Sequence, residues 1–412
     1  MATKPSIALI PSGYKASTLY SVLPSNGDAD LTTSRGSEAT RVNKDGLIET
    51  VASNIPRLDY SNGGCPSYLI EPQSTNLITN SQDINASSWD KQNLTVNTDN
   101  TISPAATQTA DKVLENNVDS SHLFYQEVAA NGNDTYNFSV FVKKLNRRYV
   151  GIQGFYNNVR GSIAFYDLDE GILVYTNQFG SGYSINDAKI EEYSDGWYRL
   201  SANITSPDSI HYLGLCLADD NWGSGTAYTN TYQGDVTKGV YIWGAQVEAL
   251  SYSTSYIKTE GSTSTRLAET ASKDNLSDHI NSSEGVLYAE VLTKNGFVSI
   301  SDGSSGNRIT FGEEGGNRVV ITANNGSLQN YISLGVWDEA FVKIAIRYSL
   351  SNLKIYINGI NVDSRNTFNL PLNLSRLGFD SGVGTSNFYG KVKDLRVYNT
   401  VLTDQELQQL TS

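Results

Sequence analysis

Apolar and polar residues alternate in several runs of this chain, and this spacing limits what the chain can fold into. In one such run, Tyr136, Phe138, Val140 and Val142 occupy every second position. Successive side chains of a β-strand point to opposite faces, so a run of this kind buries one face and exposes the other. The same alternation recurs at 198–204, 213–217, 287–291 and 342–348. The pattern predicts an all-β protein.

Turn-forming residues separate these runs. Asp167-Leu168-Asp169-Glu170-Gly171 interrupts one apolar stretch, and Asn358-Gly359 follows another. Asn-Gly between two apolar runs is a strong hairpin signal, because both turn positions need a positive φ. Short strands joined by such turns predict two β-sandwich, jelly-roll-like domains.

Changes in local composition and in the apolar pattern divide the chain into four ranges. Residues 1–80 hold short apolar pieces interrupted by Gly, Pro and Asn, with little core of their own, and are expected to be an N-terminal anchoring segment. Residues 81–250 and 280–412 carry the alternating runs and are expected to be the two sandwiches. Residues 251–279, which are rich in Ser and Thr at their start, are expected to connect them.

A short helix is predicted at the end of the chain. Thr403 and Glu406 have the spacing of a capping box, in which each side chain bonds the backbone of the other residue. Leu402 and Leu407 have the spacing of a hydrophobic staple around the same helix start. This helix is expected to pack against the last sandwich.

Charge and hydropathy exclude several classes of partner. The formal net charge is −13, which argues against nucleic acid, because phosphate contacts need a basic patch. No stretch approaches the roughly 20 apolar residues that cross a bilayer, so membrane insertion is not expected. Pro5 and Pro11 break the first apolar run, which is too short for a signal-peptide core, so synthesis in a cytoplasm without export by the general secretory route is expected. Cys65 and Cys216 are too few for a disulfide framework.

Catalytic residues are not evident in the sequence. His122, His211 and His279 lack the spacing of a metal site, and no nucleophile-elbow motif is present. The adjacent carboxylates of Asp219-Asp220 and Glu313-Glu314 would point to opposite faces of a strand, so neither pair is aimed at one bond. A non-catalytic protein without a required cofactor is therefore expected.

The loop that follows the run 213–217 is the best candidate for a binding site. Aromatic faces stack on sugar rings, while Asp and Asn bond hydroxyl groups. The same carboxylates could instead hold Ca²⁺, or the loop could be a structural turn in which Trp222 covers the end of the sandwich. The candidate glycan-binding residues are Asp219, Asp220, Asn221, Trp222, Tyr228 and Tyr232.

Several segments resemble parts of known virus proteins. The segments 40–49, 56–60 and 69–77 resemble the leader of bacteriophage tail-fibre and head-spike proteins, and 243–248 with 256–257 looks like its continuation. The segment 195–199 is similar to a strand of their carbohydrate-binding-module-like sandwich. The segments 388–398 and 402–407 resemble the last strand and helix of laminin-G-like, concanavalin A-like domains.

The resemblance implies a function and a location. It implies a non-catalytic protein of the virion surface, a tail fibre or head fibre, whose sandwiches bind host surface glycans. It also implies a homo-oligomer, which in proteins of this kind is often a trimer. The N-terminal segment is then expected to contact other virion proteins. A purely structural decoration protein without a ligand, or a glycan-degrading enzyme, remain alternatives.

Calcium is a further implication of the laminin-G-like resemblance. Such domains often hold Ca²⁺ at one edge of the sandwich. Asp302 in the segment 302–307 and Asp380 in 380–382 lie in predicted loops and are the candidate ligands. An ordinary turn is the favoured alternative for the same residues.

Overall fold

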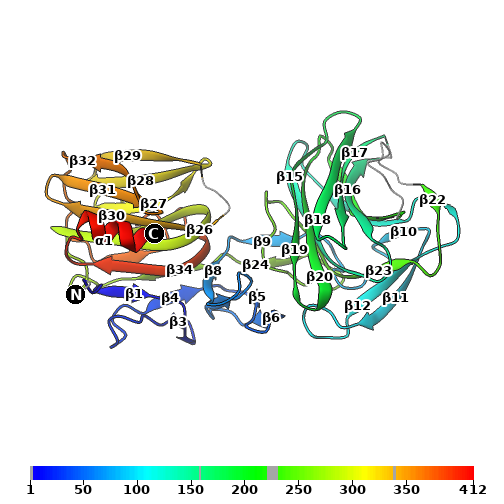
Figure 1. Ribbon diagram of the computed structural model, residues 1–412, viewed down its shortest axis with the longest axis horizontal. Helices are drawn as coiled ribbons and strands as arrows, with labels where there is room; N and C mark the ends of the chain where they lie inside the picture. The colour runs from blue at the N-terminus through cyan, green and yellow to red at the C-terminus, as the bar shows by residue number, and fades with distance from the viewer. Residues whose placement is uncertain (1–2, 157–158, 220–230, 337–339) are drawn as a thin grey trace. The chain divides into compact units, whose positions relative to one another are not determined.

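The computed structural model describes residues 3–156, 159–219, 231–336 and 340–412. Regular structure in these residues is almost entirely β-strand, which confirms the all-β prediction. No helix within them is long and apolar enough to span a membrane. The chain forms two compact units, each built from separate stretches (Figure 1). Unit 1 comprises Met1–Lys44, Val51–Pro72 and Leu267–Ser412, and unit 2 comprises Asp45–Thr50 and Gln73–Arg266.

This division differs from the expected ranges. The stretches Met1–Lys44 and Val51–Pro72 lie in the same unit as the C-terminal sandwich, whereas the sequence assigned residues 1–80 to a separate segment. Three of their strands, Ile7–Leu9, Leu31–Ser34 and Ser67–Ile70, pair with strands more than 200 residues away in the sequence. A pattern read along the chain does not reveal such distant partners.

Unit 1 takes strands from both ends of the chain. Those from the N-terminal stretches are β1 (Ile7–Leu9), β2 (Tyr14–Lys15), β3 (Thr18–Leu19), β4 (Leu31–Ser34), β5 (Ala39–Val42), β7 (Arg57–Asp59) and β8 (Ser67–Ile70). Those from the C-terminal stretch are β25 (Thr270–Lys273), β26 (Glu284–Ser301), β27 (Arg308–Glu314), β28 (Asn317–Asn324), β29 (Ser327–Val336), β30 (Val342–Ser349), β31 (Asn352–Ile357), β32 (Ile360–Arg365), β33 (Arg376–Gly378) and β34 (Tyr389–Tyr398). Helix α1 (Asp404–Thr411) ends the chain.

The long strand β26 belongs to both sheets of unit 1. Its first half pairs with β30 and β34, and its second half pairs with β27 and β33. Strands β31 and β32 extend the first sheet beyond β30, while β1 and β8 add to β34. The second sheet has the order β2-β3-β4-β25-β33-β26-β27-β28-β29. Gly296 lies where the pairing changes, at φ 77°, and a Cβ there would come within 1.9 Å of the carbonyl oxygen of Asn387.

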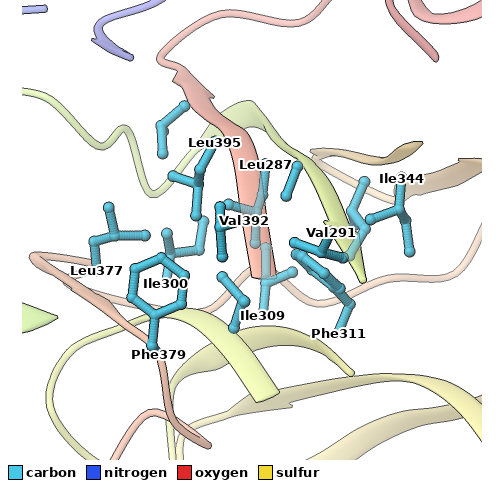
Figure 2. Close-up of a cluster of buried hydrophobic side chains, with 14 of the residues drawn as sticks. Leu287, Val291, Ile300, Ile309, Phe311, Ile344, Leu377, Phe379, Val392 and Leu395 are labelled. Atoms are coloured by element: carbon cyan, nitrogen blue, oxygen red, sulfur yellow. The ribbon is translucent and has the colours of Figure 1, made fainter. Parts of the chain in front are cut away.

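Apolar side chains from both halves of β26 enter one core. Leu287 and Val291 come from the first half and Ile300 from the second, and Figure 2 shows them among residues of the facing sheet such as Phe311. A second apolar cluster lies on the outer surface of the first sheet. Helix α1 packs on this cluster through Leu407. The predicted capping box between Thr403 and Glu406 is present, and the predicted Asn358-Gly359 turn has positive φ at both residues.

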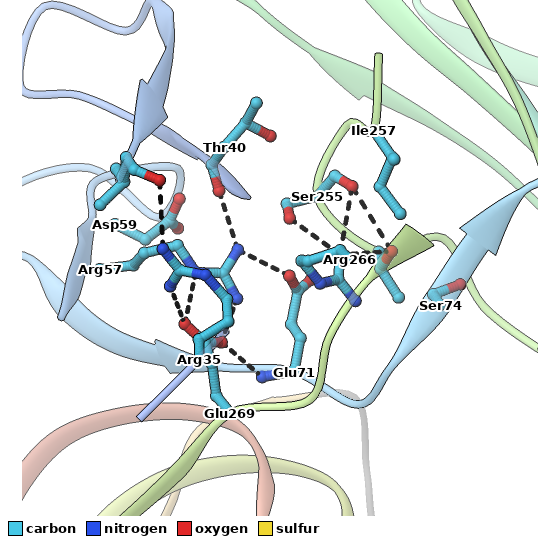
Figure 3. Close-up of polar contacts among 12 residues, drawn as sticks. Arg35, Thr40, Arg57, Asp59, Glu71, Ser74, Ser255, Ile257, Arg266 and Glu269 are labelled. Atoms are coloured by element: carbon cyan, nitrogen blue, oxygen red, sulfur yellow. Dashed lines mark hydrogen bonds and ion pairs between the residues drawn. The ribbon is translucent and has the colours of Figure 1, made fainter. Parts of the chain in front are cut away.

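A buried cluster of charges fixes the N-terminal stretches of unit 1 (Figure 3). The Glu269 carboxylate accepts from Nη1 of Arg35 at 2.6 Å, from Nε of Arg57 at 2.9 Å and from the backbone amide of Glu71 at 2.9 Å. Nη1 of Arg57 also donates to Glu71 at 2.7 Å. The carboxylates of Glu269 and Glu71 raise the pKa of Arg57 above its usual value, although burial alone would lower it.

Neutralising the central carboxylate should destabilise unit 1. In the variant Glu269→Gln, the buried guanidinium groups of Arg35 and Arg57 lose the charge of Glu269, and Arg57 keeps only its ion pair with Glu71, which costs roughly 3–5 kcal/mol. The control Arg365→Gln removes an exposed ion pair with Asp363 and should cost about 1 kcal/mol or less. Urea unfolding followed by circular dichroism measures both. Equal losses of unfolding free energy in the two variants would contradict the conclusion that the buried cluster stabilises unit 1.

Unit 2 is a second β-sandwich. Its strands are β6 (Ile48–Val51, at the boundary of the unit in sequence), β9 (Ser74–Asn76), β10 (Asp90–Gln92), β11 (Leu94–Thr101), β12 (Ala110–Glu115), β13 (Asp119–Ser120), β14 (Leu123–Ala129), β15 (Thr135–Lys144), β16 (Tyr149–Tyr156), β17 (Arg160–Asp167), β18 (Ile172–Phe179), β19 (Ser184–Glu192), β20 (Trp197–Thr205), β21 (Ile210–Ala218), β22 (Tyr232–Gln233), β23 (Gly239–Glu248) and β24 (Ser264–Arg266). A 3-10 turn at Ser194–Gly196 precedes β20.

Two antiparallel sheets enclose the core of unit 2. One has the order β11-β12-β23-β15-β20-β19, and the other, called the F sheet below, has the order β10-β14-β21-β16-β17-β18. The alternating runs at 136–142 and 213–217 supply core residues from the two sheets, as predicted. The predicted turn at Asp167–Gly171 joins β17 to β18, with the Gly171 amide bonded to the Asp167 carbonyl at 2.9 Å.

His211 on β21 is a buried polar group in this core. Its ring lies 5.2 Å from that of Tyr136 and 5.8 Å from that of Tyr183, and neither of its nitrogens has a hydrogen-bond partner in the described part of the chain. Burial lowers the pKa of His211 to about 4. The imidazole is therefore neutral in the folded protein at neutral pH.

The buried imidazole makes stability depend on pH. Because the unfolded chain takes up this proton near pH 6.5 and the folded chain only near pH 4, His211 destabilises the fold progressively as pH falls from about 6.5 to 4. Between pH 7 and 5 the wild type should lose about 2 kcal/mol more than His211→Phe, as measured by urea unfolding at both pH values. Parallel pH profiles for the two proteins would contradict this account.

Candidate functional site

The F sheet has apolar side chains on both faces. Alternate residues of its strands, including Phe124, Leu215 and Ile152, point into the core. The residues between them form a second apolar cluster on the opposite face of the sheet. We call this opposite surface the aromatic face, and define it by Tyr125, Tyr149, Phe155, Phe165, Tyr175, Phe179 and Tyr212.

Strand register arranges the outward side chains in rows across the sheet, and three of these rows carry every ring of the aromatic face except Tyr149, which lies in a further row with Ala218 and Asp167. The first row runs Gln92, Leu123, Cys216, Gly151, Phe165 and Tyr175. The second row runs Asp90, Tyr125, Gly214, Gln153, Ile163 and Asn177. The third row runs Glu127, Tyr212, Phe155, Gly161 and Phe179. Each row therefore combines rings with small or polar residues.

Three rings meet at the β14, β21 and β16 side of the aromatic face. The ring centroids of Tyr125 and Phe155 are 5.1 Å apart, and those of Tyr125 and Tyr212 are 5.5 Å apart, both in edge-to-face geometry. Phe155 and Tyr212 lie 5.4 Å apart with planes tilted by 34°. These are favourable aromatic geometries, so the rings hold one another in place before any ligand arrives.

Glycines within the rows make room for the rings. A Cβ on Gly161 would lie 2.6 Å from Phe179 and 2.8 Å from Phe155. A Cβ on Gly214 would lie 2.7 Å from the Cβ of Tyr125. A larger residue at either position would collide with these side chains and, at still shorter distances, with the backbone carbonyl oxygens of Gly154 and Phe124.

The aromatic face has a buried floor and an accessible rim. Phe165, Ile163 and Cys216 are buried, and burial raises the pKa of the Cys216 thiol to about 12, so this thiol stays protonated. Five rings around them are partly exposed, namely Tyr125, Tyr149, Tyr175, Phe179 and Tyr212. A ligand lying on the sheet would therefore touch tyrosine and phenylalanine edges over an apolar floor.

Polar groups border the rings along β10 and β14. Gln92 Nε2 donates to the Tyr125 hydroxyl at 3.3 Å. Asp90 faces Tyr125 across β10 and β14, and Glu127 faces Tyr212 across β14 and β21, and both carboxylates are exposed. Desolvation first, and then the negative charges of Asp90 and Glu127, raise the pKa values of Tyr125 and Tyr212. Both phenols are therefore hydrogen-bond donors at neutral pH.

The loop predicted to bind glycans is only partly described. Asp220, Asn221, Trp222 and Tyr228 lie outside the described residues. Asp219 directly follows β21, the strand that carries Tyr212. The predicted contacts of this loop with a sugar remain a prediction.

Tyr232, the last of the predicted glycan-binding residues, lies in the interior. Its hydroxyl donates to Glu115 at 2.6 Å, and its ring lies under the Arg147 guanidinium and beside His122. Glu115 in turn forms a buried ion pair with Arg147. A buried ring with its hydroxyl already bonded is not placed to stack on a sugar.

The two candidate calcium ligands, Asp302 and Asp380, lie in neighbouring loops of unit 1. Ser301, which precedes Asp302, donates from its Oγ to the carbonyl oxygen of Gly382 in the loop of Asp380, at 2.9 Å. Asp302 accepts from Ser304 and Asn307 within its own turn. Asp380 pairs with Arg376 and accepts from the Gly382 amide. Within the described ranges no group of three or more His, Cys, Asp or Glu side chains is arranged for a metal ion. Calcium binding stays a prediction.

Comparison with protein families identifies the C-terminal stretch of unit 1. Residues 287–408 match the model of the concanavalin A-like lectin/glucanases superfamily, a laminin G-type domain. The match runs from the first half of β26 into α1 and confirms the predicted laminin-G-like domain. It spans less than half of the chain. No curated protein sequence matches the chain.

Solved structures resemble parts of the protein only distantly. The CBM40 module of Ruminococcus gnavus IT-sialidase, bound to alpha2,3 sialyllactose, is 15% identical over 32% of this chain and 83% of its own, with a TM-score of 0.28. Domain 4 of the Geobacillus stearothermophilus arabinanase AbnA, in complex with arabinotriose, is 13% identical over 39% of this chain and 82% of its own, with a TM-score of 0.28. Domains LG4-5 of the mouse laminin alpha1 chain are 11% identical over 66% of this chain and 85% of their own, with a TM-score of 0.23. At these scores the likenesses say nothing of a shared ligand.

Proposed function

We propose that the protein binds glycans on the aromatic face of unit 2 and does not cleave them. The observation that carries the proposal is the set of partly exposed rings over an apolar floor, bordered by Asp90, Glu127 and Gln92. Sugar rings present C–H groups that stack on aromatic side chains and hydroxyl groups that bond carboxylates and amides. Exposed apolar clusters rimmed by polar residues are typical of binding surfaces.

The absence of cleavage is part of the proposal. Glycoside hydrolysis uses two carboxyl groups, one of which burial keeps protonated as the general acid. Asp90 and Glu127, the carboxylates that border the aromatic face, are both exposed. They are suited to accept hydrogen bonds from sugar hydroxyls.

Removing one ring of the aromatic face should weaken glycan binding. Tyr212→Ala should lower the affinity of the purified protein for its glycan about tenfold, because a lost aromatic contact is worth ~1.5 kcal/mol. The matched control is Tyr331→Ala, which removes a tyrosine that is 52% exposed on β29 of unit 1. Binding to intact bacteria and to their extracted polysaccharides, followed by calorimetry, measures the effect. Equal losses in both variants, or no saturable binding at all, would contradict the proposal and favour a structural role.

We further propose that the protein is displayed on the surface of a bacteriophage virion as an oligomeric fibre or spike. The support is the resemblance of segments 40–49, 56–60 and 69–77 to the leader of such proteins. Mass spectrometry of purified particles should detect the chain in several copies per virion. Its presence only in the lysate, and never in washed particles, would contradict this location.

A further inference from the structure

The charged side chains in the three rows of the aromatic face are all of one sign. Among the residues of its three rows, the ionisable acids are Asp90 and Glu127, and none of the residues in the rows is Lys or Arg. Neither carboxylate takes part in an ion pair within the described part of the chain. Both carboxylates therefore lie beside Tyr125 and Tyr212 without a cationic partner among the described residues.

The cations nearest in sequence to these rows are already bound elsewhere. On β10, Lys91 alternates with Asp90 and donates to the carbonyl oxygens of Ala86 and Trp89. On β17, Arg160 pairs with Asp208. The segments 157–158 and 220–230, which lie outside the described residues, contain no Lys or Arg in their sequence. The Arg148 guanidinium lies 5.1 Å from the ring of Tyr149, which stands outside the three rows, and it pairs with Asp167. Among the described residues of the three rows there is thus no basic side chain to neutralise an anionic ligand.

We propose that the aromatic face selects uncharged glycans and rejects those that carry carboxylate or sulfate groups. The inference rests on the proposed glycan-binding function. Asp90 and Glu127 accept hydrogen bonds from the hydroxyl groups of neutral sugars. A sugar carboxylate would instead meet two like charges at a partly desolvated surface, and a single such encounter reduces affinity roughly tenfold. Added salt screens this repulsion, so it weakens the discrimination.

Paired oligosaccharides test the selectivity directly. The full chain is titrated with neutral and uronate oligomers of equal length, namely galactose and galacturonate, glucose and glucuronate, and mannose and mannuronate. The wild type should bind at least one neutral member about tenfold more tightly than its uronate partner at low salt. In the double variant Asp90→Asn/Glu127→Gln, the ratio of the affinity for the neutral oligomer to that for its uronate partner should fall to roughly threefold or less.

A charge-matched control separates local from overall charge. Glu191→Gln/Glu192→Gln removes the same number of exposed charges from β19, in the other sheet of unit 2, and should leave the ratio unchanged. A uronate bound as tightly as its neutral partner would overturn the inference while leaving glycan binding intact. An unchanged ratio in the Asp90/Glu127 variant, or the same narrowing in the control, would also overturn it. Binding of no member of any pair would instead count against the proposed function itself.

Discussion

The carboxylate of Glu269 is the contact on which the architecture of unit 1 depends. It accepts from two buried arginines, Arg35 and Arg57, and from the Glu71 amide. The N-terminal strands are two to four residues long, too short to hold a position by their own pairing. Buried charges tolerate little displacement, because separating them leaves an unpaired charge in a low-dielectric interior.

The two units treat the apolar outer surface of a sheet differently. In unit 1, α1 covers such a surface through Leu407, which packs with Tyr288 and Tyr356. In unit 2, the rings of the aromatic face remain partly exposed, and the described residues supply no α-helix to cover them. An apolar surface that a protein leaves accessible usually has a partner. This contrast between neighbouring sandwiches is the reason to place the function on unit 2.

Alternation along the chain predicted the strands and the core-facing residues, and local turn and cap signals predicted the hairpins and α1. The aromatic face was missed for a physical reason. Strand β17 reads Ile163-Ala164-Phe165-Tyr166, with apolar residues on both faces, so alternation does not distinguish an outward ring from a core residue. Only the register of β14, β21 and β16 brings Tyr125, Tyr212 and Phe155 together, and this register depends on contacts up to 93 residues apart.

For the proposed glycan binding, the geometry of the aromatic face favours a chain of sugars over a single sugar. The rows cross strands spaced about 4.8 Å apart, so rings on β14 and β18 are separated by several strand spacings. A single sugar contacts few of these rings, and each contact is weak. An extended glycan reaches several rings at once. Display of several copies of the protein would raise the overall affinity, because each further binding event takes place at a high effective concentration. Weak contacts per ring are therefore compatible with firm attachment, provided that the ligand is long and the protein is presented in multiple copies.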